Sequence, residues 1–577
     1  MVEGSPNRKM PEIRHDAFCG RIDYVCAHPR LPEAGRLVLE ESVYRFAGFK
    51  PVKVDLLADW TVNPLQQRSW QWGTAALNFI PWLIAHHGRS GSFAAIEFAM
   101  EAIRSWRAAV SRKLLQDYEF LDHDHATALR GENAMLLLAY LHRNDIGHAY
   151  WTELAEFIDG IVRLLEKDSF YSRHTNHGVE QSRILAMAAD LLPTHRASTR
   201  RWRLAASRLL DELRFAFTSD GVHVENSPAY HQYVCDSFLK IADMFPRERL
   251  PELNDAIDAI MPKAMRYLAH VIRPDFKFPI VGDTGAKWAA NPFTRYAATP
   301  EYQWLDYVAS RRVRGQVPPE TVVAFPEAGY VIMRDRWKTP GQGGREYHLV
   351  MKCGFHSLYH RHDDDFNIVM MCGQDWLIDG GAYAYAEQLP VRRYLRSKWA
   401  HNVPVIDMGD ERWPRMHGRK HAAQMSVHEQ DDGIVVDARS SGYPGYTAIR
   451  RVEFMPKRRR FVVHDKIEPE SPREAVQFRS LWHIPAYRDV FRRGQDILVR
   501  SRKNALAMLI TNIGDPCDGA GIFRPRLEHY ANAVVSWQAN RLEPAKIIAF
   551  SAKREAFDCR LQFDMVEVED LAGWDPL

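Results

Sequence analysis

The stretch WTELAEFIDGIVRLLEKD, residues 151–168, has the spacing of an amphipathic helix. Its apolar residues recur every three or four positions, which places them on one helical face. They are Leu154, Phe157, Ile158, Ile161, Leu164 and Leu165. Helices in series with short breaks indicate an array of helical hairpins, either open or closed into an (α/α) toroid. Similar patterns occur from about residue 60 to residue 315, at 74–87, 132–143, 182–192, 207–217 and 255–272.

The character of the chain changes in the run RRVRGQVPPETVVAFPEAG, residues 311–329, which predicts a linker because of its proline and glycine content. Short runs of alternating apolar and polar residues follow, bounded by Gly, Pro or Asp, as is typical of antiparallel strands. Helices first and strands second predict two segregated domains. The strand-like runs include 330–337, 346–354, 366–371, 375–381, 433–440, 448–455, 460–467, 497–502, 505–513 and 533–538.

A chain of 577 residues is too long for one ordinary core. We therefore predict an irregular N-terminal arm at residues 1–45, a helical toroid at 46–315 and an antiparallel β-domain at 316–577. The 76 Lys and Arg residues nearly balance the 73 Asp and Glu residues, so no global field favours binding to nucleic acid or membrane.

The seven cysteines are odd in number and show no C-x-x-C spacing, which argues against a disulfide framework or a thiolate zinc site. The first residues lack the apolar stretch of a secretory signal, and no run of the sequence is long and apolar enough to span a bilayer. We expect a cytoplasmic protein, or a periplasmic one if a leader precedes this sequence.

The first candidate motif is the run from Thr175 to Glu180. Thr175 or Asn176 suits a helix N-cap, and the spacing places His177 and Glu180 one turn apart on a common face. An ordinary helix start has the same pattern.

The second candidate motif is the run from Glu225 to His231. Ser227 suits the N-cap and Pro228 the first helical position. Tyr230 would then lie in the first turn, where the helix dipole favours a phenolate and lowers its pKa, so that it could relay a proton. The alternative is a tyrosine that only packs at a helix end.

The third candidate motif is HSLYHRHDDD, residues 356–365, followed by Asp379 and by His401. On a strand, His360 and His362 would point to the same side. Histidine and carboxylate ligands from adjacent strands are what a zinc ion accepts. A solvated polar loop is the alternative.

In this order the three motifs resemble the heparinase II/III family of polysaccharide lyases, whose members act on heparan sulfate, heparin and alginate. The resemblance runs from about Trp60 to Asn402. It implies an α+β multidomain chain, with an N-terminal (α/α) toroid (an incomplete barrel of helical hairpins) followed by a C-terminal antiparallel β-sandwich. The matching segments are 122–133, 176–180, 225–230, 360–363, 366–383 and 396–403.

The resemblance also implies an activity and a substrate. The enzyme would be a lyase that cleaves a uronic-acid-containing glycan by β-elimination and leaves a 4,5-unsaturated uronate. The glycan would be a glycosaminoglycan, a polyuronate or a bacterial exopolysaccharide. Its partner is thus an acidic polysaccharide, and a homodimer is left open.

Carried over residue by residue, the resemblance implies roles in catalysis. Asn176 and His177 would bind the uronate carboxylate, Tyr230 would be the proton shuttle and His360 a second base. One structural zinc ion per chain would be held by His362, Asp379 and His401. The residues expected to contact substrate are Glu180, Arg130, His125, Tyr383 and His231.

The chemistry explains why such residues are needed. The C5 proton of a uronate is a very weak acid, and aimed donors that neutralise its carboxylate are commonly worth ~3–4 kcal/mol each. Tyr230 and His360 would supply an acid and a base. This requires Asn176 and His177 to converge with Tyr230 and His360 around one groove.

Two other readings remain open at this point. A glycoside hydrolase needs two opposed carboxylates, and Glu180, Glu225 and Asp283 are candidates, although no spacing singles out a pair. The third reading is a non-catalytic glycan-binding protein of exopolysaccharide assembly.

Overall fold

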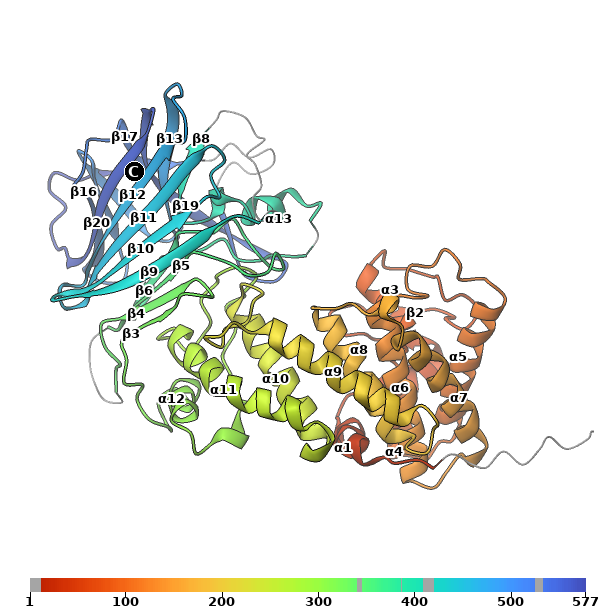
Figure 1. Ribbon diagram of the computed structural model, residues 1–577. Helices are drawn as coiled ribbons and strands as arrows, with labels where there is room; N and C mark the ends of the chain where they lie inside the picture. Colours follow the sequence, from red (N-terminus) through yellow and green to blue (C-terminus); the bar gives the residue numbers. More distant parts are fainter. Residues whose placement is uncertain (1–11, 340–344, 386, 408–419, 525–532) are drawn as a thin grey trace, which may run out of the picture. The chain divides into compact units, whose positions relative to one another are not determined.

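The computed structural model describes residues 12–339, 345–385, 387–407, 420–524 and 533–577 (Figure 1). The chain forms two compact units. The first, called unit 1, contains Met1–Phe215 and Lys240–Ala256; the second, unit 2, contains Ala216–Leu239 and Ile257–Leu577. Residues 216–239 and 257–315, which belong to the predicted toroid, are part of unit 2.

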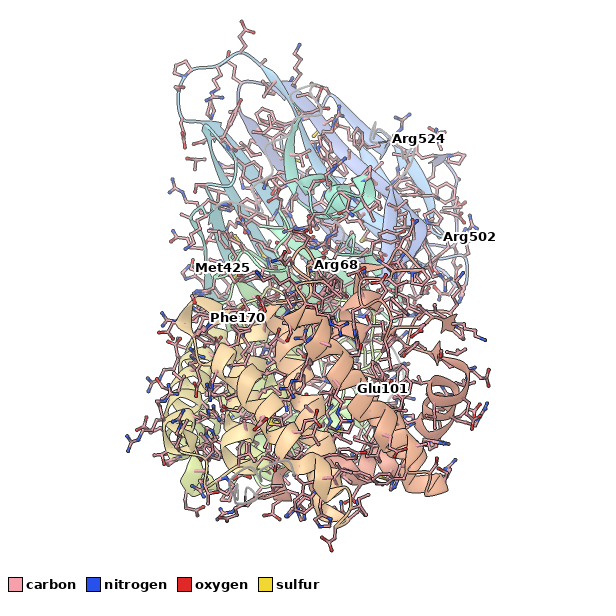
Figure 2. The ribbon with its side chains drawn as sticks, turned by 90° about the vertical axis from the view of Figure 1, so that its right-hand side faces the viewer. Arg68, Glu101, Phe170, Met425, Arg502 and Arg524 are labelled. Atoms are coloured by element: carbon pink, nitrogen blue, oxygen red, sulfur yellow. The ribbon has the colours of Figure 1, made fainter. Side chains whose placement is uncertain are left out.

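Unit 1 is built from α-helices, with one short pair of strands. In Figure 2, Glu101 marks one of the long helices, α5. The elements are α1 (Cys19–Ala27), α2 (Leu31–Glu41), β1 (Val43–Tyr44), β2 (Val52–Lys53), α3 (Arg68–Ala75), α4 (Ile80–Ser90), α5 (Ala94–Ser111), α6 (Asp124–Arg143), α7 (His148–Leu165), α8 (Asn176–Leu191) and α9 (Ser198–Ala216).

Helix α6 is the core helix of unit 1. Its residues from Ala126 to Leu141 are almost all buried, as expected for a helix that is covered on every side. It packs against α4, α7 and α8. Helix α7 has the predicted amphipathic face, since Leu154, Phe157 and Ile158 are among its buried residues.

Two predictions for this region are wrong. The expected irregular arm at 1–45 contains the helices α1 and α2, whose buried residues (Leu37 and Val38 among them) pack it into the unit. Helix α2 is strongly amphipathic, with Leu37 and Val38 on its buried face, so the expectation of a weakly periodic segment fails there. The single helix predicted at 74–87 is two helices, because Leu77 has a positive φ of 56° and α4 begins at Ile80, with Pro81 in its first turn.

Unit 2 combines helices with antiparallel strands. Helices α10 (Pro228–Met244) and α11 (Pro251–Val271) have residues in both units, and α12 (Pro300–Ala309) and α13 (Pro390–Leu395) lie in unit 2. Its strands are β3 (Val322–Phe325), β4 (Tyr330–Arg334), β5 (Tyr347–Lys352), β6 (Asn367–Cys372), β7 (Asp375–Leu377), β8 (Pro404–Asp407), β9 (Ala423–Gln430), β10 (Gly433–Ser440), β11 (Tyr446–Met455), β12 (Arg460–Pro469), β13 (Val476–Pro485), β14 (Asp489–Arg493), β15 (Asp496–Arg500), β16 (Leu506–Asn512), β17 (Gly519–Phe523), β18 (Val534–Gln538), β19 (Arg541–Arg554), β20 (Phe557–Glu567) and β21 (Asp575–Pro576).

The strands of unit 2 form three sheets among the described residues. The largest has the order β21-β14-β15-β16-β20-β12-β11-β10-β9, and Figure 1 shows its central strands side by side. Met425 marks its edge strand β9 in Figure 2. The other sheets have the orders β17-β19-β13-β8, with β18 also paired to β19, and β3-β4-β5-β6-β7.

Burial along the strands follows their position. Strand β11 alternates buried and half-buried residues along its whole length, so one face packs on the core. Strands β4, β5 and β6 are buried at every position, so both faces of that sheet are covered. The predicted linker at 311–329 is wrong in part, because β3 occupies 322–325. In the parts of the chain that the structure describes, no helix has the length and apolarity needed to cross a membrane.

A buried ion pair joins the strands of unit 2. Arg450 on β11 donates two hydrogen bonds to Asp465 on β12, at 2.6 and 2.7 Å. Its remaining nitrogen donates to the carbonyl oxygens of Phe366 and Asn402, at 2.8 and 2.6 Å. Neither charged side chain is exposed by more than 1%. One guanidinium therefore satisfies backbone groups near β6 and β8 as well as the carboxylate.

We predict that Arg450→Met lowers the free energy of unfolding by about 3–5 kcal/mol, because Asp465 is left buried without its counter-charge. Urea denaturation followed by tryptophan fluorescence measures the change. The control is Arg451→Met, since the Arg451–Asp437 pair is exposed and its loss should cost less than about 1 kcal/mol. Equal effects of the two substitutions would contradict the assignment.

Candidate active site

A buried carboxylate organises the candidate site of unit 2. Asp283, in the turn Gly282–Gly285, accepts hydrogen bonds from His360 Nδ1 and from His362 Nε2, both at 2.8 Å. The two terminal nitrogens of Arg392, on α13, each donate a hydrogen bond to one oxygen of Asp283, at 2.5 and 2.9 Å. Burial raises the pKa of this carboxyl, but the bonds from His360, His362 and Arg392 outweigh burial and hold the pKa well below its usual value. Asp283 is therefore a fixed negative charge.

Three segments distant in sequence meet around this carboxylate. Asn226, just before α10, donates to the carbonyl oxygens of Ser357 and Tyr359 at 2.9 and 3.1 Å. The hydroxyls of Ser227 and Thr284 lie 2.7 Å apart. A Cβ at Gly282 would lie 2.4 Å from the Asn226 carbonyl oxygen, so this close approach requires glycine. The two candidate motifs of unit 2, at 225–231 and 356–365, are thus tied to each other and to the segment 282–285.

Tyr230 and His360 are in direct contact. Their rings stack with centroids 4.0 Å apart and an interplanar angle of 24°. Tyr230 lies in the first turn of α10. As predicted, Ser227 caps this helix: its hydroxyl oxygen accepts a hydrogen bond from the backbone N–H of Tyr230 at 3.4 Å. His360 has a positive φ of 52°, a sparsely populated backbone conformation that the surrounding contacts maintain. The structure brings the predicted shuttle and the predicted second base together.

Tyr385 is a member of this group that the sequence did not reveal. Its hydroxyl lies 2.9 Å from the Tyr230 hydroxyl, and its ring lies 5.6 Å from His360 at 75°. Tyr385 is 59% exposed, so it forms the open edge of the group. The predicted residue Tyr383, two positions earlier, packs instead beside the apolar cluster of Val391, Tyr394, Leu395 and Ala400.

The prediction that the pKa of Tyr230 is lowered is wrong. Burial raises it above its ordinary value, and the hydrogen bond with Tyr385 and the charges of Asp283 and Glu225 act in the same direction. The helix dipole, which motivated the prediction, is weaker than these effects. In the free protein Tyr230 therefore keeps its proton.

The bond to Asp283 fixes the proton arrangement of His360. A carboxylate only accepts, so Nδ1 of His360 donates, and in the neutral ring the lone pair lies on Nε2. That nitrogen is 3.4 Å from Oε2 of Glu225, a residue that is 8% exposed. The two nitrogens of His360 thus face two carboxylates, Asp283 and Glu225.

The three predicted metal ligands are buried together in unit 2. The rings of His362 and His401 have centroids 5.3 Å apart, and His401 Nδ1 is hydrogen-bonded to Asp379. Three buried atoms have no hydrogen-bond partner among the described residues: His362 Nδ1, His401 Nε2 and Asp379 Oδ2. The other ring nitrogen of His362 donates to Asp283, which is the usual arrangement behind a metal ligand. The other ring nitrogen of His401 bonds to Asp379, itself one of the three predicted ligands.

All three aspartates that follow His362 are buried, and two of them have printed partners inside the fold. Asp364 accepts from Lys352 at 2.7 Å, with both side chains 1% exposed. Asp365 is bonded to His421 and accepts from Ser440 at 2.9 Å. These carboxylates therefore present no exposed negative charge to an acidic ligand.

A second histidine group lies in unit 1, at the start of α8. Thr175 caps this helix by accepting from Gly178 N at 3.1 Å, which is one of the two predicted caps. His177 Nδ1 is 2.9 Å from Asp124, which also accepts from Ser172. Burial opposes ionisation of Asp124, but these bonds outweigh it and lower its pKa. His177 is thus held by one nitrogen, and its Nε2 is left for a ligand.

The predicted residues His125 and Glu180 lie near this group. The His125 ring stacks on His177, with centroids 4.5 Å apart and an angle of 25°. Burial, and then the charge of His177, lower the pKa of His125 to about 4, so this ring is neutral near pH 7. Glu180 pairs with Arg183 at 2.5 Å, and Arg183 also contacts the buried Glu132 at 2.9 Å. Glu180 is therefore already paired with a cation in the free protein.

Two predicted substrate contacts are wrong. Arg130 is 4% exposed, and its guanidinium donates to the carbonyl oxygens of Ala75, Phe120 and Leu121 while covering the Trp106 ring. His231 is 1% exposed, and burial lowers its pKa to about 3. It accepts from the His223 backbone and donates to the Ala264 carbonyl oxygen, so both of its nitrogens are used. Each residue stabilises the fold and offers no atom to a sugar.

Two protein-family models match the sequence of this chain. The model of the heparinase II/III N-terminus matches residues 35–307, and the model of the heparinase II/III-like C-terminal domain matches residues 317–561. The two matches together cover most of the chain. The chain belongs to the heparinase II/III-like family.

One curated protein of known activity is a distant relative of this chain. A heparin-sulfate lyase of Bacteroides stercoris is 24% identical over 250 residues, which is 41% of this chain and 36% of that protein. The matched region thus spans only about a third of that curated relative.

Solved structures support the fold. The crystal structure of heparinase III superposes with a TM-score of 0.73 at 15% identity, over 98% of this chain and 88% of that one. The heparan sulfate lyase HepC of Pedobacter heparinus gives 0.68 at 16% identity, over 95% and 86%. These likenesses confirm the predicted fold class, a helical toroid domain followed by an antiparallel β-domain.

A buried glutamate shapes the loop that leads into Asn176 and His177 at the start of α8. This loop begins after Phe170, which is labelled in Figure 2. Glu212 on α9 accepts from the Tyr171 hydroxyl and from His174 N, the latter at 2.9 Å. A Cβ at Gly178 would lie 2.5 Å from Glu212 Oε1. Burial raises the pKa of Glu212 to about 7, although the two bonds act the other way.

This raised pKa predicts a pH-dependent stability. A carboxyl with a folded pKa of about 7 and an unfolded pKa near 4.3 contributes its stability fully below pH 4.3. The contribution is lost as the pH rises to about 7, by roughly 3 kcal/mol. Glu212→Gln cannot ionise, so we predict that denaturation at pH 5 and at pH 8 gives a smaller loss for this variant than for the wild type.

The neighbouring Asp211 provides the control. Its pKa is lowered by hydrogen bonds from Arg173, so Asp211→Asn should keep the wild-type loss between pH 5 and pH 8. An unchanged pH dependence in Glu212→Gln would show that Glu212 is ionised in the folded protein at low pH.

Proposed function

We propose that this protein is a polysaccharide lyase that cleaves a uronate-containing glycosaminoglycan by β-elimination, with heparan sulfate as the first substrate to test. The observation that carries the proposal is the stacked pair of Tyr230 and His360, with His360 held by the buried Asp283. Family membership and the names of the relatives, a heparin-sulfate lyase and a heparan sulfate lyase, support the reaction and the substrate class.

The proton arrangement of the pair suggests how the two transfers are divided. Elimination breaks the C5–H bond, moves that electron pair into a C4–C5 double bond and expels O4 with the electrons of its bond. Nε2 of His360, whose Nδ1 is bonded to Asp283, accepts the C5 proton. Tyr230, which enters the reaction protonated, gives its proton to O4, and Tyr385 donates a hydrogen bond to the phenolate left behind.

The developing negative charge on the uronate also needs stabilisation. To Asn176 and His177, in unit 1, we assign the binding of a uronate carboxylate of the substrate, through neutral or cationic donors. The bond from His177 to Asp124 fixes its ring and directs Nε2 away from Asp124. Aimed donors of this kind are typically worth ~3–4 kcal/mol each in the transition state.

We further propose that His362, Asp379 and His401 hold one structural zinc ion. Three buried atoms without a hydrogen-bond partner, two imidazole nitrogens and one carboxylate oxygen, are a donor set that zinc accepts. At least one pair of these atoms is more than 4.8 Å apart, so binding requires a small side-chain adjustment. The ion would secure the loop that carries His360, and it takes no part in the proton transfers.

The lyase proposal predicts the effect of Tyr230→Phe. Loss of the phenolic proton should lower kcat on heparan sulfate by about 1000-fold, the usual size of one acid or base contribution, while KM changes little. The ultraviolet absorbance of the 4,5-unsaturated product measures the rate.

The control is Tyr233→Phe, the same substitution one turn further along α10, where the ring is 49% exposed. We expect kcat within about threefold of wild type for this variant. A fully active Tyr230→Phe enzyme, or cleavage without unsaturated product, would rule out the mechanism.

The zinc proposal predicts a difference in metal content. His401→Ala should contain about one zinc ion fewer per chain than the wild type, because a ligand is lost from a buried site. Elemental analysis after gel filtration gives the content. His428→Ala, on the exposed edge strand β9, is the control and should match the wild type. Equal zinc in the His401 variant and the wild type would refute the ligand assignment.

A further inference from the structure

A group of metal-binding side chains lies near the beginning of the described chain, in unit 1. It comprises His15, Asp16 and Cys19, at the short helix Asp16–Phe18 and the first residue of α1. One ligand atom from each residue lies within 4.8 Å of the others, and no other set of three among the described residues meets this condition. The group is separate from the residues assigned to catalysis and to the zinc site of unit 2.

A second histidine meets this group from a distant part of the sequence. His142, in the last turn of α6, places its Nδ1 2.9 Å from Nδ1 of His15. Two nitrogens bound to one tetrahedral zinc ion lie roughly 3.3 Å apart, because each Zn–N bond is about 2.0–2.1 Å. The spacing of the two rings is therefore already close to that of two metal ligands.

The chemistry of the group favours a divalent metal over a simple hydrogen bond. Asp16 and Cys19 lie at the N-terminal end of α1, where the helix backbone favours the negative charge of a carboxylate or a thiolate. Two imidazoles, one thiolate and one carboxylate are all ligands that zinc accepts.

The surroundings hold the group in place. Arg143, next to His142, donates to the Cys19 carbonyl oxygen at 3.4 Å and to Asp23 at 2.7 Å. The backbone of Arg14 donates to the Leu191 carbonyl oxygen at 2.9 Å, which fixes the segment that precedes His15. The Cys19 thiol is half-buried and forms no disulfide. Ligand atoms of His15, Asp16 and Cys19 thus lie within 4.8 Å of one another, and His142 adjoins the group through His15.

We propose that His15, Asp16, Cys19 and His142 bind a zinc ion that fastens the first helices of the chain to the end of α6. The ion links segments more than 120 residues apart in sequence. Its role is structural, since the residues assigned to catalysis lie elsewhere.

Cobalt substitution separates this site from the one in unit 2. The ligands assigned there, two histidines and an aspartate, contain no sulfur, whereas the site at Cys19 supplies a thiolate. Co²⁺ added to metal-free full-length protein should therefore produce a near-ultraviolet thiolate-to-cobalt charge-transfer band. Cys19→Ser should abolish the band, and Cys26→Ser, at a half-buried cysteine on the same helix, should leave it unchanged.

Zinc affinity provides a second readout for the same proposal. In competition with a chromophoric chelator, His142→Ala should weaken one class of bound zinc at least about tenfold. His148→Ala, at an exposed histidine paired with Asp145, is the matched control. Far-ultraviolet circular dichroism establishes that each variant is folded. The absence of a cobalt band in the wild type, a band that persists in Cys19→Ser, or unchanged zinc affinity in His142→Ala would overturn the proposal.

Discussion

The arrangement of the candidate site in unit 2 depends on one buried negative charge, the carboxylate of Asp283. A buried carboxylate is costly unless it is paired and fully hydrogen-bonded, and here His360, His362 and Arg392 provide the partners. The cost of burial thus dictates where these three side chains lie. Because the same carboxylate binds both His360 and His362, the proposed base and a proposed zinc ligand are fixed by one group. The role of Asp283 also excludes it as a free acid of a hydrolase.

Carboxylate–histidine pairs recur throughout the described chain, and each determines which ring nitrogen remains available. Asp124 holds His177, Asp283 holds His360, and Asp379 holds His401. A carboxylate accepts the proton of one nitrogen and leaves the lone pair of the other for a proton, a substrate or a metal. The same local device therefore serves substrate binding, proton transfer and metal binding in the proposed function.

Local chemistry made part of this structure predictable from the sequence. Thr175 and Ser227 cap their helices because a hydroxyl just before a helix accepts a hydrogen bond from a backbone N–H of the first turn. Strands form in the predicted runs from 330 onward, and β11 has the alternating burial that the sequence suggested. The burial of individual polar side chains could not be predicted from the sequence in the same way. Arg130 and His231 have polar side chains, yet both lie inside the fold and bond to the backbone.

The remaining differences arise from contacts between residues far apart in sequence. Asp283 and His360 are separated by 77 positions, so the sequence offered Asp283 only as one of several carboxylates. Tyr383 and Tyr385 flank one alanine, and the backbone, with φ of 60° at Tyr383, selects Tyr385 for the site. The pKa of Tyr230 depends on the same long-range contacts, which outweigh the helix dipole. The spacing of residues along the sequence does not show which distant side chains will be in contact, so it could not predict these contacts or the pKa of Tyr230.

The central claim is that Asp283 acts on catalysis through His360, and a double-mutant cycle tests it most directly. The value of kcat/KM on heparan sulfate is measured for Asp283→Asn, for His360→Ala and for the double variant, with folding checked by circular dichroism. If Asp283 works through His360, the double variant is no slower than His360→Ala, to within about threefold. If the two losses multiply, Asp283 acts independently of His360 and the account is contradicted.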